Sequence, residues 1–244
     1  LPLPRPWSWY SGAHLYYQAT EDIQCHRSWW LPFFGYFKYD KQMSFEETSL
    51  SDIKSAKKIM RRDAEFRRQK LARNAGEFVP QRLLENFTET WNPPSWAVIS
   101  AFWPFKSELD IRLLIHHLGG NGYSIALPEV TKKCDPLLFR KWTKDIKLVK
   151  DNYGVLCLPD NAKIVLPDWL LVPLLAFDKA GFRLGYGGGF YDLTLAKLRK
   201  EKKIFAIGVA YDDQIVEKVP RDQHDSRLDA ILTERQVYIM GDSK

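Results

Sequence analysis

Residues 169–192 read Trp-Leu-Leu-Val-Pro-Leu-Leu-Ala-Phe-Asp-Lys-Ala-Gly-Phe-Arg-Leu-Gly-Tyr-Gly-Gly-Gly-Phe-Tyr-Asp. The apolar run from Trp169 to Ala176 is typical of a buried strand, and a helical pattern opens near Tyr191 and Asp192. Between them lie four glycines at positions 185–189, which can take positive φ angles and bring the backbone close to an anion. A strand, a glycine loop and a helix in this order present backbone N–H groups to phosphate, so the sequence predicts an anion-binding loop.

The spacing of these glycines matches neither the dinucleotide pattern G-x-G-x-x-G nor the P-loop pattern G-x-x-x-x-G-K-[ST]. The plain alternative is a tight turn, but four glycines flanked by Arg183 and Asp192 exceed what a turn needs. Asp192 has two open roles, because its carboxylate can either bind Mg²⁺ beside a phosphate or cap the helix. Asp229, at the start of a late strand pattern, is the candidate for a second metal ligand.

Short apolar runs alternate with helical patterns on both sides of this loop. Helices are expected from Ser51, as an N-cap, through Phe66, and at 80–87, 111–118 and 193–203, with buried strands at 96–102, 123–127, 169–176, 204–210 and 230–233. In the first helix Ile53, Ile59 and Phe66 are expected on the apolar face, with cations on the other. The alternation predicts an α/β layered fold with a largely parallel sheet.

Composition and charge narrow the class of protein. The 244 residues are 45% hydrophobic and 27% charged, and no apolar stretch reaches the roughly 18 residues of a membrane span, which argues against a membrane protein. Cys25, Cys134 and Cys157 are scattered, so neither a disulfide framework nor a zinc site is expected, and a cytoplasmic location fits. The net charge of +6 indicates an anionic partner, which can be nucleic acid, a membrane surface or a phosphorylated or carboxylated small molecule.

Residues 1–42 differ from the rest, with many aromatic residues in no clear period. Because Met43-Ser-Phe-Glu-Glu reads as an initiation site, residues 1–42 are expected to be a leader and 43–244 a single domain. A lid of docked aromatic residues is the alternative for this leader.

The segment Leu171–Asp192 resembles the signature of the 5-formyltetrahydrofolate cyclo-ligase family, in the glycine-rich form that recurs among bacterial members. The resemblance extends to Lys57–Arg61, Phe102–Asp110, Leu127–Pro128, Leu138–Trp142 and Arg227–Asp229, and so covers roughly residues 50–240. It implies a three-layer α/β/α fold and an ATP- and Mg²⁺-dependent enzyme that closes 5-formyltetrahydrofolate to 5,10-methenyltetrahydrofolate. Such an enzyme acts on small molecules, and we expect a monomer that binds neither nucleic acid nor membrane.

The resemblance also implies a set of site residues. The predicted ATP ligands are Lys57, Arg61, Arg183, Leu184, Gly185, Tyr186, Gly187, Gly188, Gly189, Phe190 and Tyr191. The predicted folate contacts are Trp103, Glu108 and Tyr153, together with Tyr186, Gly187, Gly188, Gly189 and Phe190 of the loop. Asp192 and Asp229 are the predicted Mg²⁺ ligands. Residues four apart share one helix face, so Lys57 and Arg61 can reach one polyphosphate.

Two positions depart from the common family pattern Gly-Lys-Gly-Tyr-Tyr-Asp, because Gly188 replaces the lysine and Phe190 the first tyrosine. The positive charge is then expected from Arg183, Lys57, Arg61 and Mg²⁺. The remaining cations of the first helix, among them Arg67, Arg68 and Arg73, are expected on a solvated basic face. Two other functions stay open: a nucleic-acid-binding accessory protein, favoured by that basic face, and a catalytically silent folate-binding member, favoured by Gly188.

Overall fold

The computed structural model describes residues 50–150, 154 and 156–241, which belong to one compact unit. The predicted leader at 1–42, its boundary with the domain, and the predicted folate contact Tyr153 lie outside the described residues, so these remain predictions.

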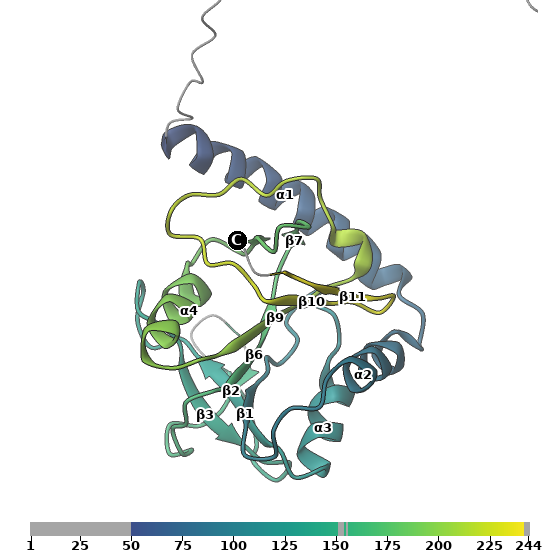
Figure 1. Ribbon diagram of the computed structural model, residues 1–244, viewed down its shortest axis with the longest axis vertical. Coiled ribbons are helices and arrows are strands. Elements are labelled where there is room, and N and C mark those ends of the chain that lie inside the picture. Colours follow the sequence, from purple (N-terminus) through teal and green to yellow (C-terminus); the bar gives the residue numbers. More distant parts are fainter. Residues whose placement is uncertain (1–49, 151–153, 155, 242–244) are drawn as a thin grey trace, which may run out of the picture. The chain divides into compact units, whose positions relative to one another are not determined.

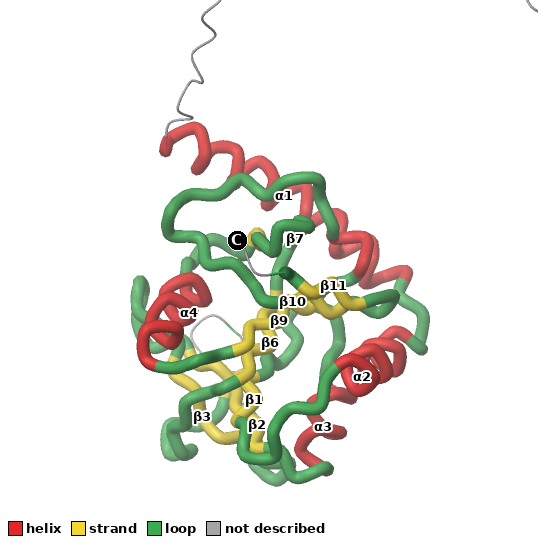
Figure 2. Tube along the Cα trace, viewed as in Figure 1, coloured by secondary structure: helices red, strands yellow, loops and turns green. Residues whose placement is uncertain are grey.

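A seven-stranded sheet forms the centre of the domain, in the order β11-β10-β9-β6-β1-β2-β3 (Figure 2). Its strands are β1 (Val98–Ser100), β2 (Ser124–Glu129), β3 (Leu138–Trp142), β6 (Trp169–Pro173), β9 (Phe205–Val209), β10 (Ala230–Leu232) and β11 (Val237–Ile239). The five inner strands run parallel, whereas β3 and β11 pair antiparallel at the two edges. Two small hairpins, β4 (Val149–Lys150) with β5 (Leu156–Cys157) and β7 (Ala176–Phe177) with β8 (Arg183–Leu184), lie outside this sheet.

Helices cover both faces of the sheet. They are α1 (Leu50–Asn74), α2 (Val79–Thr90), α3 (Arg112–Gly120) and α4 (Phe190–Glu201), with a 3₁₀ turn η1 (Asp212–Gln214). Helices α2 and α3 lie on one side of the sheet and α4 on the other (Figure 1). None of the helices in the described part of the chain is long and apolar enough to cross a bilayer.

The alternation of side chains along β6 shows why two layers form. Leu170 and Val172 pack in one core cluster with Leu195 of α4, while Leu171, between them, packs in the other cluster with residues of α2 and α3. Successive side chains of a strand point to opposite faces, so a strand that is apolar throughout is buried on both. The predicted three-layer α/β/α fold with a largely parallel sheet is confirmed.

Helix α1 departs from its prediction. It packs across the segments that follow β6 and β9, where Ala64 belongs to one hydrophobic cluster with Leu175 and Val219. Its buried residues are Lys57, Ala64 and Arg68, whereas Ile59 is 60% and Phe66 70% exposed. The expected burial of Ile59 and Phe66 is therefore wrong, as is the solvated position expected for Arg68. Ser51 lies within the helix and is not its N-cap.

Candidate functional site

A pocket of about 860 Å³ lies at the carboxyl ends of β1, β2 and β6. Strand β1 stands where the chain order of the sheet reverses, with β2 on one side and β6 on the other. Ligands of open α/β sheets bind at such a reversal, because the segments that leave the neighbouring strands diverge there. The pocket walls come from α1, the segment after β1, the end of β2, the glycine loop with the start of α4, and residues 222–226.

The β7–β8 hairpin presents the glycine loop to this pocket. Buried Asp178 shapes its turn, since Oδ1 accepts the N–H groups of Ala180 and Phe182, both at 3.0 Å, and Oδ2 accepts that of Val219 at 2.9 Å. The loop ends at Gly189, whose φ of 70° is left-handed and which precedes the first residue of α4. No side chain of the described residues caps α4, so the N–H groups of its first turn remain available to an anion.

Asp192 fastens the end of this loop to the segment 222–226. Arg183 Nη2 donates to Asp192 Oδ1 at 2.8 Å, and the backbone N–H of Ser226 donates to the same oxygen at 3.0 Å. Arg183 Nη1 also donates to the carbonyl oxygen of Ser226 at 2.7 Å. The N-cap of α4 is Gly189 and Asp192 lies inside the helix, so N-capping by Asp192 is excluded, whereas metal binding stays a prediction.

Arg61 brings a guanidinium group against the glycine loop. Its Nε donates to the carbonyl oxygen of Gly185 at 3.0 Å. A Cβ atom placed on Gly187, whose φ is +103°, would lie 3.2 Å from Arg61 Cζ. The loop thus has a second cation beside it, in addition to Arg183 at its start, although residues 184–190 carry no charged side chain.

The Phe190 ring lies close to Gly188 in the loop. A Cβ atom on Gly188 would lie 2.5 Å from Cε2 of Phe190, so the phenyl ring occupies the space that a side chain at position 188 needs. A side chain at position 188 would therefore require the Phe190 ring to move.

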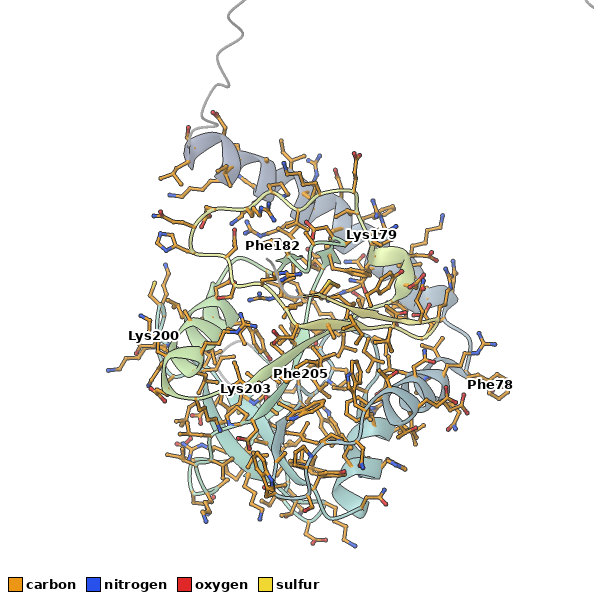
Figure 3. All side chains as sticks on the ribbon, viewed as in Figure 1. Phe78, Lys179, Phe182, Lys200, Lys203 and Phe205 are labelled. Carbon is orange, nitrogen blue, oxygen red and sulfur yellow. The ribbon has the colours of Figure 1, made fainter. Side chains whose placement is uncertain are left out.

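Lys57 reaches the pocket in an ion pair. Its Nζ donates to Asp222 Oδ2 at 2.8 Å and to Asp225 Oδ2 at 2.6 Å, and the residue is 8% exposed. Burial alone would lower the pKa of Lys57, but the hydrogen bonds to Asp222 and Asp225 outweigh it and raise this pKa above its ordinary value. Arg221, which precedes Asp222, places its guanidinium 4.1 Å from the ring centre of Phe182 in the β7–β8 hairpin. Figure 3 labels Phe182 near Lys179 of the same hairpin.

Asp229 is not brought to the pocket. Its Oδ2 accepts the N–H of Ala206 at 2.7 Å and Arg199 Nη2 at 3.0 Å, and Asp229 is absent from the pocket walls in the described structure. The carboxylates that line the pocket near Asp192 are Asp222 and Asp225. Their contact with Lys57 joins distant parts of the sequence, and no local motif indicated it. In the described part of the chain, no three His, Cys, Asp or Glu residues form a metal cage.

Trp103 and Glu108 line the pocket from the segment after β1. Glu108 Oε2 accepts the N–H of Phe105 at 2.9 Å, and Oε1 lies 3.9 Å from Arg68 Nη1. The Glu108 side chain is only 7% exposed. Burial raises the pKa of Glu108 above its ordinary value, although the Phe105 N–H and the Arg68 charge act against this.

Glu108 should make stability depend on pH in a defined direction. Because its folded-state pKa is raised, the charged form is disfavoured in the fold, and stability is lost as the pH rises through that pKa. The free energy of unfolding of Glu108→Gln minus that of wild type is therefore expected to be more positive at pH 7.5 than at pH 4.5. Urea unfolding at both pH values measures this, and a difference between the two proteins that is equal at both pH values would contradict it.

Fold and pocket together define an α/β protein with an anion-binding site at the carboxyl edge of a parallel sheet. Comparison with known proteins gives the particular family: the chain belongs to the 5-formyltetrahydrofolate cyclo-ligase family, whose family model matches residues 52–234. The predicted membership is thereby confirmed.

Named relatives agree with this assignment. The chain is 36% identical over 145 residues to the 5-formyltetrahydrofolate cyclo-ligase of Escherichia coli K12, covering 57% of this chain and 79% of the relative. It is 36% identical over 141 residues to that of Haemophilus influenzae, covering 55% and 74%. The solved 5,10-methenyltetrahydrofolate synthetase of Aquifex aeolicus matches with a TM-score of 0.62 and 27% identity, covering 77% of this chain and 94% of that one.

Proposed function

We propose that this chain catalyses the ATP- and Mg²⁺-dependent cyclisation of 5-formyltetrahydrofolate to 5,10-methenyltetrahydrofolate, with release of ADP and phosphate. The observation that carries the proposal is one pocket with two chemically different walls. One wall has the glycine loop with Arg61 and Lys57, and the other has Trp103 and Glu108. The first suits a polyphosphate, and the second suits a flat ring with N–H groups at its edge.

The reaction requires a good leaving group on the formyl carbon and no nucleophilic side chain of the protein. The formyl oxygen attacks the γ-phosphorus of ATP, and the bond between that phosphorus and the β,γ-bridging oxygen breaks to release ADP. N10 then attacks the activated carbon, its proton is lost, and the C–O bond breaks to release phosphate. The tasks of the protein are to align the formyl oxygen with the γ-phosphate and to neutralise charge.

Each predicted contact has a role in this alignment. The loop 183–191 and the start of α4 hold the triphosphate, together with Arg61, while Trp103 packs on the pterin ring and Glu108 accepts its N–H groups. Lys57 reaches the phosphates by exchanging one or both of its aspartate partners for phosphate oxygens. Tyr153 stays a predicted folate contact.

The pocket residues fit a Mg²⁺ ion that arrives with ATP. Mg²⁺ is commonly held by one or two carboxylates plus phosphate oxygens and waters, and Asp192 and Asp225 supply carboxylates on the pocket wall. When bound, the ion neutralises charge on the transferring phosphoryl group. Asp229 stays a predicted ligand, and its binding would first require release from Arg199.

The direct test is an assay of the pure protein with 5-formyltetrahydrofolate, ATP and Mg²⁺. We expect a rise in methenyl absorbance with one ADP formed per cyclisation, abolished by chelation of Mg²⁺. The assay is run on the full chain and on residues 43–244. Failure of both folded proteins to turn over would refute the proposal, and tight folate binding without ATP hydrolysis would instead identify a silent folate-binding member. Action as a monomer in the cytoplasm, without nucleic acid, remains part of the proposal.

A further inference from the structure

Arg68 has the largest fully buried side chain in the described structure, with 1% of its surface exposed. A guanidinium carries five N–H donors and never loses its charge, so its burial is costly unless it is both hydrogen-bonded and neutralised. The hydrogen bonds and the counter-ion of Arg68 therefore indicate which interactions compensate for its burial.

The donors of Arg68 are used on neutral oxygens from three separate segments. Nε donates to Ser107 Oγ at 3.2 Å, Nη1 donates to the Leu174 carbonyl oxygen at 3.1 Å, and Nη2 donates to the Tyr186 hydroxyl. These partners come from the segment after β1, the segment after β6, and the glycine loop. One side chain of α1 thus connects the segment that holds Glu108 to the glycine loop.

The anion that balances Arg68 is held at a distance. Glu108 Oε1 lies 3.9 Å from Arg68 Nη1, which is within reach of the charge but beyond a hydrogen bond. No donor of the described residues lies within hydrogen-bond distance of Oε1, since the Phe105 N–H is donated to Oε2. Arg68 therefore balances the negative charge of Glu108, while Oε1 can still accept a hydrogen bond from a ligand.

We propose that Arg68 is a positioning residue that joins the two halves of the site: it keeps the Glu108 carboxylate charged and free to accept from a ligand, and it holds Tyr186 in the glycine loop. The inference rests on the proposed function, because it takes the folate pterin as the ligand of Glu108. The other titratable groups that face Glu108 are Tyr186 from the loop and Tyr191 from α4. Both are neutral near pH 7, so Arg68 is the cation on which the Glu108 charge depends.

A double-mutant cycle on the full chain tests the link between Arg68 and Glu108. The variants are Arg68→Met, Glu108→Gln and their combination, and the measurement is binding of 5-formyltetrahydrofolate without ATP, from pH 5.5 to 8.5. Arg68→Met is expected to weaken binding by about tenfold or more at pH 7.5 and to move the loss of binding on the acid side to higher pH. On the Glu108→Gln background, the same change is expected to cost less than about threefold, with no movement of the pH profile.

Two further variants separate the functions of the guanidinium. Tyr186→Phe removes only the hydroxyl that Arg68 contacts, so we expect a higher KM for ATP with an unchanged pH profile of folate binding. The matched control is Arg67→Met, because Arg67 is adjacent and exposed and donates to the Ile215 carbonyl oxygen at 3.5 Å. This change is expected to alter folate binding less than twofold.

A role in packing alone predicts a different pattern. Arg68→Met would then weaken folate binding equally on both backgrounds and leave the pH profile in place, which would overturn the inference.

If Arg68→Met does not fold, the combined variant decides: recovery of folding when Glu108 is neutral supports the pair, and failure of both refutes it. If wild type converts 5-formyltetrahydrofolate but the two substitutions have additive effects on folate binding, the inference about Arg68 is refuted and the proposed function stands. If wild type neither binds nor converts it, the proposed function falls as well.

Discussion

Gly187→Ala is expected to lower kcat/KM for ATP by about a hundredfold in a protein that still folds. The φ of +103° at Gly187 is one that L side chains rarely adopt, so the loop must change its backbone conformation to accept a methyl group. The new Cβ would also lie 3.2 Å from Arg61 Cζ, which displaces the guanidinium beside the loop. The substitution therefore disturbs both the N–H groups and the cation that meet the phosphates.

Gly122→Ala is the matched control for this substitution. Gly122 precedes β2 with a φ of +87° and has no heavy atom within 4 Å of a Cβ, so alanine there causes similar backbone strain away from the pocket. Both variants should lose stability, about 1 kcal/mol, in thermal unfolding. Only Gly187→Ala should lose activity in the cyclisation assay, and equal activities in the two variants would show that the loop geometry is not needed for ATP.

Lys57→Met is expected to lower kcat/KM for ATP by about 10²- to 10³-fold. The change removes a cation that the proposed mechanism places on the phosphates. It also leaves Asp222 and Asp225 close together without their shared partner, and their charges would then repel an incoming polyphosphate. A steady-state titration of ATP at fixed folate measures the effect, and we expect a lower midpoint of thermal unfolding as well.

The adjacent Lys58→Met is the control, because Lys58 is exposed on the same helix. It removes the same charge from the protein but not from the pocket, and its kcat/KM should stay within about twofold of wild type. A similar loss in both variants would mean that the general positive field of α1 attracts ATP and that no specific contact of Lys57 is involved.

The central strands were predictable because they are buried on both faces. Runs such as 169–176 and 204–210 are apolar throughout, and this composition identifies inner parallel strands. The edge strands β3 and β11 were not predicted. In β3 the sequence Leu-Phe-Arg-Lys-Trp places a buried Arg140 beside an exposed Lys141, so neither strict alternation nor a continuous apolar run is present.

The site was predictable where it depends on a contiguous motif. The glycine loop with Arg183 and Asp192, and the helix positions Lys57 and Arg61, all lie on the pocket walls. Arg68 was missed because the usual rule buries apolar residues, and here α1 turns its cations inward and leaves Phe66 outside. Asp222 and Asp225 were missed as pocket residues because their contact with Lys57 depends on tertiary structure and has no local signal.

The ion pair of Lys57 joins residues 168 positions apart, and the Arg61 contact with Gly185 spans 124. Loop closure over such separations is slow, so these contacts are expected among the last steps of folding. During synthesis, α1 leaves the ribosome long before either partner exists, and Lys57 lacks its two aspartate partners until residues 222–225 emerge. A chain cut short before Asp222 would keep every inner strand except β10 and still be unable to assemble the pocket.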